Sequence, residues 1–204
     1  MPMRQPICVV LGHIDSGKTS ILDKIRGTAV QKREAKGITQ HIGASMLDTE
    51  TINAIGGELL KSFNVKLTIP GVLVIDTPGH SSFFNLRKRG GAVADFAILV
   101  VDVLNGFQAQ TYECIDILKT RKTPFLIAAN KVDRINGWVP SGSLSILNSL
   151  KKQPDFVLRF LDERIYEIMG DLSRLGFSGD RFDRVRDFTR NIAIIPTSAV
   201  TGEG

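Results

Sequence analysis

The feature that most constrains this chain is a short loop near its amino terminus. Residues 12–19 read Gly-His-Ile-Asp-Ser-Gly-Lys-Thr, which fits the pattern G-x-x-x-x-G-K-T. An apolar run at residues 7–11 precedes the loop and a helical pattern at residues 21–25 follows it, a context typical of a phosphate site. Glycine lets backbone N–H groups point inward around phosphate oxygens, and the amino end of the helix adds its positive dipole. We therefore expect Lys18 to reach the β- and γ-phosphates of a nucleotide and the Thr19 hydroxyl to ligate Mg²⁺.

Apolar runs alternate with helical patterns along the 204 residues, which favours one α/β domain. Strands are expected at residues 7–11, 44–48, 72–75, 96–103, 124–129 and 192–195, and helices from the phosphate loop to residue 27, at 51–63 and at 108–120. This alternation predicts a mainly parallel six-stranded sheet with helices on both faces. Residues 32–43 are polar and aperiodic, so we expect a loop there.

A long polar and helical section precedes the last predicted strand. Six of its apolar residues recur at steps of three and four: Val157, Leu161, Ile165, Ile168, Leu172 and Leu175. This spacing predicts one amphipathic helix whose apolar stripe lies against the body of the domain. We expect residues 134–191 to form a docked helical insertion that makes no contact with a nucleotide.

Composition excludes several classes of protein. The net charge of +5 is compatible with a nucleic-acid partner and equally with a solvated basic surface. No apolar run approaches the ~20 residues of a membrane helix, and the amino terminus lacks a signal-peptide pattern, so we expect a cytoplasmic protein without a membrane partner. Cys8 and Cys114 lie in apolar segments and are expected to be buried, reduced thiols.

A second loop with chemistry follows the predicted strand at residues 72–75. Residues 76–79 read Asp-Thr-Pro-Gly and fit the pattern D-x-x-G. Open α/β sheets bind ligands at the carboxyl ends of their strands, where this loop lies. Asp76 is expected to hold Mg²⁺, often through water, and the Gly79 N–H to bond a γ-phosphate oxygen, since glycine allows close backbone approach.

A third loop, residues 130–133, fits the pattern N-K-x-D. The carboxylate of Asp133 can accept hydrogen bonds from N1–H and the 2-amino group of guanine, and adenine has no donors in that arrangement. The loop therefore predicts selection of GTP over ATP. We expect the aliphatic stem of Lys131 to cover the base and the amide of Asn130 to tie loops together.

A fourth loop, residues 197–199, reads Thr-Ser-Ala and follows the last predicted strand. It is expected to offer a backbone N–H, that of Ala199, to guanine O6. Each loop taken alone is weak, because short patterns recur by chance. Four such loops in this order, each at a strand end, indicate a guanine-nucleotide site.

With these residues the chain resembles the translational GTPases and, within them, the initiation-factor class called factor two in bacteria and factor five B in archaea and eukaryotes. The matching stretches are residues 12–15, 37–43 for the first switch, 76–80 and 84–91 for the second switch and its helix, and 130–138. Residues 85–91 are the most class-specific, whereas residues 134–138 and the insertion look archaeal or eukaryotic. Ser16 departs from the family, which often has His or Thr there, and we expect the loop to keep its shape.

The resemblance implies a Ras-like P-loop G domain that hydrolyses GTP to GDP and phosphate. The nucleotide-binding residues that it implies are Asp15, Ser16, Gly17, Lys18, Thr19, Ser20, Asn130, Lys131, Asp133, Ser198 and Ala199. Mg²⁺ would be held by Thr19, Thr39 and Asp76. The catalytic set would be His80, which orients the attacking water, with Thr39 and Gly79, which contact the γ-phosphate side. The resemblance also implies a monovalent cation near Asp15, for which a loop-capping carboxylate is an equally good explanation.

The resemblance further implies a monomer that promotes joining of the ribosomal subunits and whose GTPase activity the ribosome stimulates. Initiator tRNA and another initiation factor would bind through downstream domains that this chain does not contain. Two alternatives remain open. The first is the G domain of another ribosome-directed GTPase, such as a tRNA-delivering elongation factor, against which residues 85–91 and the insertion count. The second is a GTP-binding module that scarcely hydrolyses, against which the presence of Thr39 and His80 counts.

Overall fold

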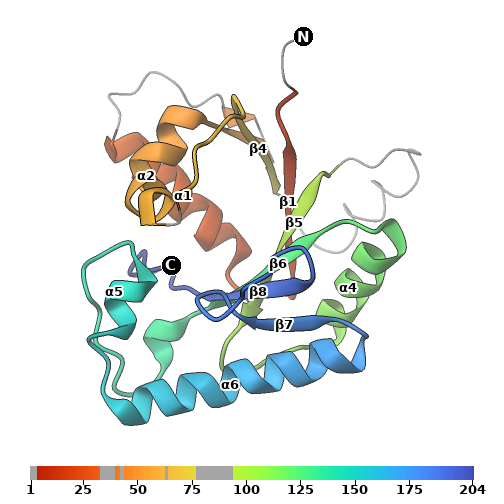
Figure 1. Cartoon of the computed structure of the whole chain (residues 1–204), viewed down its shortest axis with the longest axis vertical. Helices are drawn as coiled ribbons and strands as arrows, with labels where there is room; N and C mark the ends of the chain where they lie inside the picture. Colours follow the sequence, from red (N-terminus) through yellow and green to blue (C-terminus); the bar gives the residue numbers. More distant parts are fainter. Residues whose placement is uncertain (1–3, 33–39, 42–43, 63, 77–93) are drawn as a thin grey trace.

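The computed structural model describes residues 4–32, 40–41, 44–62, 64–76 and 94–204, which form one sheet flanked by helices (Figure 1). The sheet has eight strands in the order β2-β3-β4-β1-β5-β6-β8-β7. They are β1 (Ile7–Gly12), β2 (Gln40–His41), β3 (Ala44–Asp48), β4 (Gly71–Asp76), β5 (Phe96–Asp102), β6 (Phe125–Asn130), β7 (Ser178–Arg181) and β8 (Asn191–Pro196). Only the β2–β3 and β3–β4 pairs among these are antiparallel. The mainly parallel α/β sheet that the sequence predicts is therefore confirmed.

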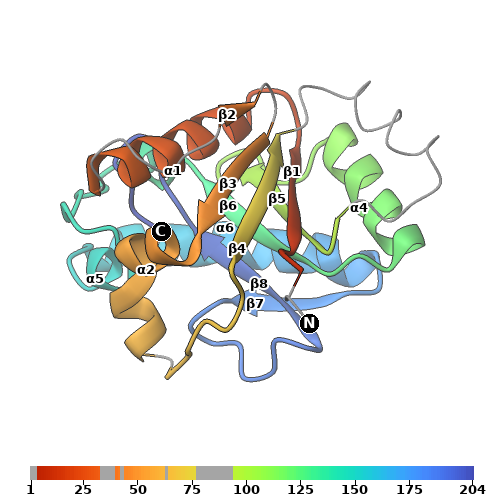
Figure 2. The ribbon, with the colours of Figure 1, turned by 90° about the horizontal axis from the view of Figure 1, so that it is seen from above.

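The described helices cover both faces of this sheet (Figure 2). They are α1 (Lys18–Lys32), α2 (Thr49–Ser62), α4 (Ala109–Arg121), α5 (Ile146–Leu150) and α6 (Asp155–Arg174), with the 3₁₀-helix η1 (Val132–Arg134). Alternation along β1 assigns the faces, because successive side chains of a strand point to opposite sides. Val9 and Leu11 join the core beneath α4 and α6, whereas Cys8 and Val10 join a smaller core with Leu22 of α1.

Two edge strands account for the difference between the six strands predicted and the eight observed. Among the described strands β7 pairs with β8 alone, and its four residues, Ser-Gly-Asp-Arg, include no large apolar side chain and none is fully buried. It thus lacks the apolar alternation by which a strand is recognised in sequence. β2 has two residues and lies within the segment 32–43 that was predicted to be a loop. Lys32 belongs to α1, and residues 33–39 and 42–43 lie outside the described part of the chain.

The first helix is longer than its prediction. α1 continues to Lys32, although Gly27 was expected to end it. A glycine inside a helix costs only about 1 kcal/mol relative to alanine, and a β-carbon at Gly27 would meet nothing within 4 Å. The glycine is therefore a tolerated helix residue and not a stop signal.

The section from 134 to 191 contains α5, α6 and β7. Five residues of the predicted stripe are buried in α6 at 0 % exposure: Val157, Leu161, Ile165, Ile168 and Leu172. The sixth, Leu175, follows the helix as its C-cap residue and is partly buried against the same core. These side chains belong to the same core as β5, β6 and β8. The section also adds β7 to the sheet, which the prediction of a purely helical insertion missed.

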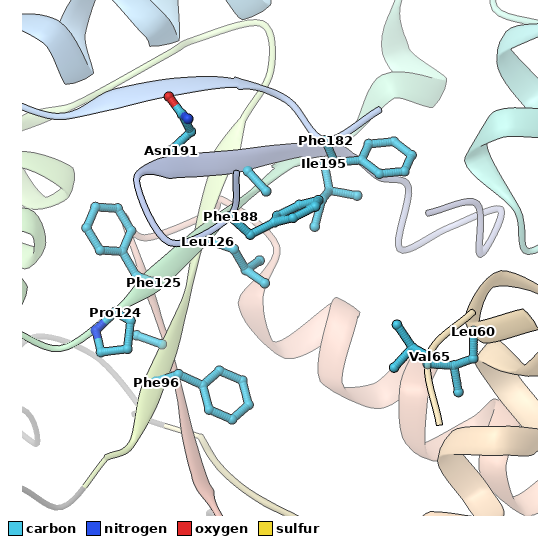
Figure 3. Close-up of a pocket in the computed structure, with 12 residues that line it drawn as sticks. Leu60, Val65, Phe96, Pro124, Phe125, Leu126, Phe182, Phe188, Asn191 and Ile195 are labelled. Carbon is cyan, nitrogen blue, oxygen red and sulfur yellow. The ribbon is translucent and has the colours of Figure 1, made fainter. Parts of the chain in front are cut away.

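An apolar groove of about 600 Å³ lies where β5 and β6 begin (Figure 3). Phe96 and Phe125 line it from the first residues of these strands, and Leu60 and Val65 line it from α2 and the turn that follows. The loops with the predicted site residues follow the carboxyl ends of the same sheet. The groove is therefore separate from the candidate site.

Both cysteines are free thiols. Cys8 is buried, as expected, whereas Cys114 is partly exposed. Over the residues that the structure describes, none of the helices combines the length and the apolar character needed to cross a bilayer. The same residues contain no group of three or more His, Cys, Asp or Glu side chains arranged to hold a metal ion.

Candidate nucleotide-binding site

The loop at residues 12–19 connects β1, in the middle of the sheet, to the first turn of α1. Two of its glycines are required by close approach. A β-carbon at Gly12 would lie 2.2 Å from the carbonyl oxygen of Val100, and one at Gly17 would lie 2.2 Å from Nδ2 of Asn130. Both glycines also have positive φ, at 146° and 95°, which other residues rarely adopt. The loop thus lies tightly against β5 and β6, and a side chain at either glycine would push it away from them.

Lys18 is the first residue of α1, and its side chain folds back over the loop. Its Nζ donates to the carbonyl oxygens of Gly12, at 3.0 Å, and of His13, at 2.6 Å. The ammonium group is therefore positioned at the loop, beside the backbone N–H groups at the helix start. This places a positive charge where the predicted phosphates would lie.

The next two residues, Thr19 and Ser20, are exposed in the first turn of α1. The backbone of Asp76 ends β4 and pairs with Val10 of β1, next to the loop. A threonine hydroxyl and a carboxylate are oxygen ligands of the kind that Mg²⁺ prefers, so this donor set fits the predicted ion. The side chain of Asp76 and the residues Thr39, Gly79 and His80 lie outside the described part of the chain, and their roles stay predictions.

Asn130, at the end of β6, is buried and joins the predicted phosphate loop to the predicted base loops. Its Nδ2 donates to the carbonyl oxygen of Ser16 at 2.9 Å, and its Oδ1 accepts from the backbone N–H of Ala199 at 3.1 Å. One amide thus fixes the distance between the loops, as the sequence analysis expected. The backbone N–H of Ala199, which is predicted to bind guanine O6, already donates to Asn130. It would therefore have to donate to Asn130 and to the base at the same time.

Asp133 lies in η1, and one of its carboxylate oxygens accepts a hydrogen bond from the hydroxyl of Ser198. Ser198 is 2 % exposed, and its own Oγ accepts from the backbone N–H of Thr201 at 3.1 Å. The carboxylate is therefore oriented by the neighbouring loop. The structure brings together two residues, 65 positions apart in sequence, that were predicted to contact the same base.

Lys131 has an ion-pair partner that sequence reasoning missed. Its Nζ lies 2.7 Å from Oδ2 of Asp102, the last residue of β5, while Oδ1 of Asp102 accepts from the N–H of Leu104. The pair borders a cavity of about 220 Å³ that Asp15 and Ser16 also line. The sequence does carry a signal for Asp102. It ends an apolar strand, as do the residues that begin three of the ligand loops.

Glu203 is the second residue that sequence reasoning missed. Its side chain is 1 % exposed, which is rare for a glutamate. It lies behind the loop of residues 197–199, because its backbone oxygen accepts from the N–H of Ser198 at 2.8 Å. The local sequence does not mark this carboxylate as buried, since three of its four donors, those of Trp138, Ser141 and Ser149, lie 65, 62 and 54 positions away.

Comparison with known proteins supports the interpretation of these loops. The sequence model of the family described as "Elongation factor Tu GTP binding domain" matches residues 3–204. A protein of Sulfurisphaera tokodaii named "Probable translation initiation factor IF-2" is 59% identical over 202 residues, which are 99% of this chain and 34% of that protein. The chain thus spans about a third of the length of that relative.

Solved structures give the same result. The crystal structure of GDP-bound aIF5B from Aeropyrum pernix matches with a TM-score of 0.92 and 56% identity, over 99% of this chain and 34% of that chain. A bacterial selenocysteine-specific elongation factor matches with a TM-score of 0.54 and 21% identity, over 99% of this chain and 27% of that chain, and shares the fold alone. Because the family model covers nearly every residue, the chain belongs to the family of elongation factor Tu GTP-binding domains.

Proposed function

We propose that this chain is the GTP-binding and GTP-hydrolysing switch domain of a translation initiation factor that promotes joining of the ribosomal subunits. The observation that carries the proposal is the Asn130 amide, which holds the phosphate loop and the base loop at a fixed separation. The similarity to aIF5B supports the assignment to initiation. The elongation-factor alternative is less favoured, since the elongation factor above shares only the fold.

In this proposal the phosphates lie on residues 15–20 and the guanine lies between residues 130–133 and 198–199. Lys18 and the first N–H groups of α1 neutralise phosphate charge. Thr19, Thr39 and Asp76 hold Mg²⁺, which offsets the negative charge that develops on the phosphate oxygens. A monovalent cation near Asp15 belongs to the same proposal.

Hydrolysis would act as the switch. Thr39 and Gly79 contact the γ-phosphate side only while GTP is bound, so loss of the phosphate releases both switch segments. His80 orients the attacking water, and the ribosome completes the site. The partners proposed for the whole factor are both ribosomal subunits, initiator tRNA and another initiation factor, and the factor is proposed to be a cytoplasmic monomer.

Nucleotide binding and phosphate release together test the proposal. The chain should bind GDP and GTP in a titration with a fluorescent guanine nucleotide, and ATP should not displace them. Phosphate release by the full-length factor should rise when assembled ribosomes are added. Equal competition by ATP, or release that ribosomes leave unchanged, would contradict the proposal.

Replacement of His80 by alanine should separate binding from turnover. A group that positions the attacking water contributes about 10²–10⁴-fold to rate, so ribosome-stimulated phosphate release should fall by about that factor. Affinities for GTP and GDP should stay within a few-fold, because the side chain is not proposed to touch the ground-state nucleotide. The resemblance to translational GTPases also implies that Ile14 and Ile38 flank the γ-phosphate and screen it from His80 until the ribosome binds, so the slow basal rate should barely change.

Stopped-flow binding beside stimulated phosphate release measures both quantities. Full stimulated turnover in the His80→Ala factor would remove His80 from catalysis. A parallel loss of nucleotide binding and ribosome docking would assign it instead to shaping the second switch.

A further inference from the structure

We infer that Glu203 is a positioning residue for guanine recognition. Its carboxylate joins the loop that carries Ser198 and Ala199 to the segment that follows Asp133, so both base-contacting loops are anchored to one buried group. The inference rests on the proposed function, since it specifies what keeps the proposed guanine site in shape. It also assigns a role to part of the 134–191 section, which makes no predicted contact with the nucleotide.

Four donors converge on this carboxylate. Oε1 accepts from the backbone N–H of Ser141 at 2.7 Å and from the hydroxyl of Ser149 at 2.6 Å. Oε2 accepts from the indole N–H of Trp138 at 3.0 Å and from the hydroxyl of Thr201 at 2.8 Å. A buried charge is stable only when its hydrogen bonds are made, and a fully satisfied buried network of this kind holds its members rigidly.

The carboxylate is ionised at neutral pH. Burial alone would raise the pKa of Glu203, but the hydrogen bonds from Ser149, Ser141, Trp138 and Thr201 together outweigh it and lower the pKa to about 2. Its negative charge is thus part of the folded structure under ordinary conditions.

A short chain of hydrogen bonds connects Glu203 to the base-reading carboxylate. The hydroxyl of Thr201 donates to Oε2 of Glu203, and the backbone N–H of Thr201 donates to Oγ of Ser198. The hydroxyl of Ser198 in turn donates to the carboxylate of Asp133. Two backbone bonds close the same turn, from Ser198 N to the oxygen of Glu203 and from Gly202 N to the oxygen of Ser198, both at 2.8 Å. A change at the Glu203 carboxylate therefore reaches Asp133 through three successive bonds.

A second connection links Glu203 to the residues that follow Asp133 in the sequence and to α5. Trp138 follows Asp133 by five residues, is 8 % exposed, and its backbone N–H bonds the oxygen of Ile135 just after η1. Ser149 lies in α5, and the N–H of Gly204 bonds the oxygen of Leu144 before that helix. The carboxyl-terminal residues accordingly lie beside α5 (Figure 1). Glu203 thus links η1, α5 and the last base loop.

The test compares GDP with inosine diphosphate, which lacks the 2-amino group that Asp133 is proposed to bind. In Glu203→Gln one carboxylate oxygen becomes an NH₂ group. If the NH₂ group takes the place of Oε2, it faces the indole N–H of Trp138; if it takes the place of Oε1, it faces the backbone N–H of Ser141. Either orientation of the amide therefore places a donor against a donor. The variant keeps the size of the side chain but can no longer accept all four hydrogen bonds.

For Glu203→Gln we expect the Kd for GDP to rise on the order of tenfold, because a mismatched buried donor is costly. The ratio of the Kd for inosine diphosphate to that for GDP should fall at the same time, since Asp133 is no longer held in place. Ser149→Ala removes one donor without placing donor against donor, so it should move both quantities in the same direction by about threefold. It also keeps the inference testable if Glu203→Gln does not fold.

Asp162→Asn is the matched control. It removes the ion pairs of Asp162 with Arg181 and Arg184 within the same section, and these pairs involve no residue of the base loops. It should lower Tm without changing the selectivity ratio. An unchanged ratio in both Glu203→Gln and Ser149→Ala, whatever their Tm, would reduce Glu203 to a general stabilising role and overturn the inference. Failure of the unmodified chain to bind GDP would overturn the proposed function first, and this inference with it.

Discussion

Lys18→Ala is expected to weaken the binding of GTP and GDP by about a hundredfold or more while leaving the fold intact. The ammonium group of Lys18 lies over the phosphate loop, bonded to the carbonyl oxygens of Gly12 and His13. Bound phosphates would add charge-assisted hydrogen bonds, each worth about 1.5–3 kcal/mol, and every 1.4 kcal/mol is a factor of about ten in affinity. Titration with a fluorescent guanine nucleotide measures the loss.

Two further variants make the Lys18 result specific. Lys61→Ala removes an exposed lysine in the last turn of α2 and should leave the affinity unchanged. Thr19→Ala should abolish the gain in affinity that Mg²⁺ provides, because the hydroxyl is proposed to ligate the ion. Tight, Mg²⁺-dependent GTP binding by both Lys18→Ala and Thr19→Ala would overturn the assignment of the phosphate loop.

Asp133→Asn is expected to exchange the base preference from guanine to xanthine. The amide oxygen can still accept the hydroxyl of Ser198, as the carboxylate does. Its NH₂ group would then face the base, where it clashes with the donors of guanine but matches the carbonyl that xanthine carries at that edge. We expect GTP to bind about a hundredfold more weakly, through loss of charge-assisted bonds of about 1.5–3 kcal/mol each, and xanthosine triphosphate to bind better.

A competition assay between GTP and xanthosine triphosphate measures this exchange. Asp116→Asn, the same change at an exposed position of α4, is the control and should keep the preference for guanine. If Asp133→Asn also keeps that preference, then Asp133 does not contact the base.

Strands and helices were predictable where their signal is local. The stripe of α6 needed only the spacing from Val157 to Leu172, since a helix with that periodicity has one face to bury. β7 was not predictable, because among the described strands it pairs with residues 191–194 alone and it carries no apolar side chain that requires burial. The end of α1 was misplaced at Gly27 because glycine is a weak signal inside a helix that is stabilised by tertiary contacts.

The residues of the candidate site were likewise predictable only where a local pattern marks them. The sequence placed Lys18, Asn130 and Asp133 in loops that meet, because each follows a parallel strand of one sheet. Asp102 and Glu203 escaped detection because their importance comes from partners that are distant in sequence. Glu203, for example, bonds Trp138 across 65 positions. Such a pairing depends on the packing of the 134–191 section, which no local pattern encodes.

The position of Cys8 gives the domain a thiol that can report on ligand occupancy. Cys8 lies in β1 between β4 and β5, and burial raises its pKa to about 12. Only the thiolate reacts with alkylating reagents, so at neutral pH modification has to wait until the centre of the sheet opens. A nucleotide on the loop that β1 leads into would slow that opening by the factor 1 + [L]/Kd. The rate at which an alkylating reagent modifies Cys8 would then measure ligand affinity without a label on the nucleotide.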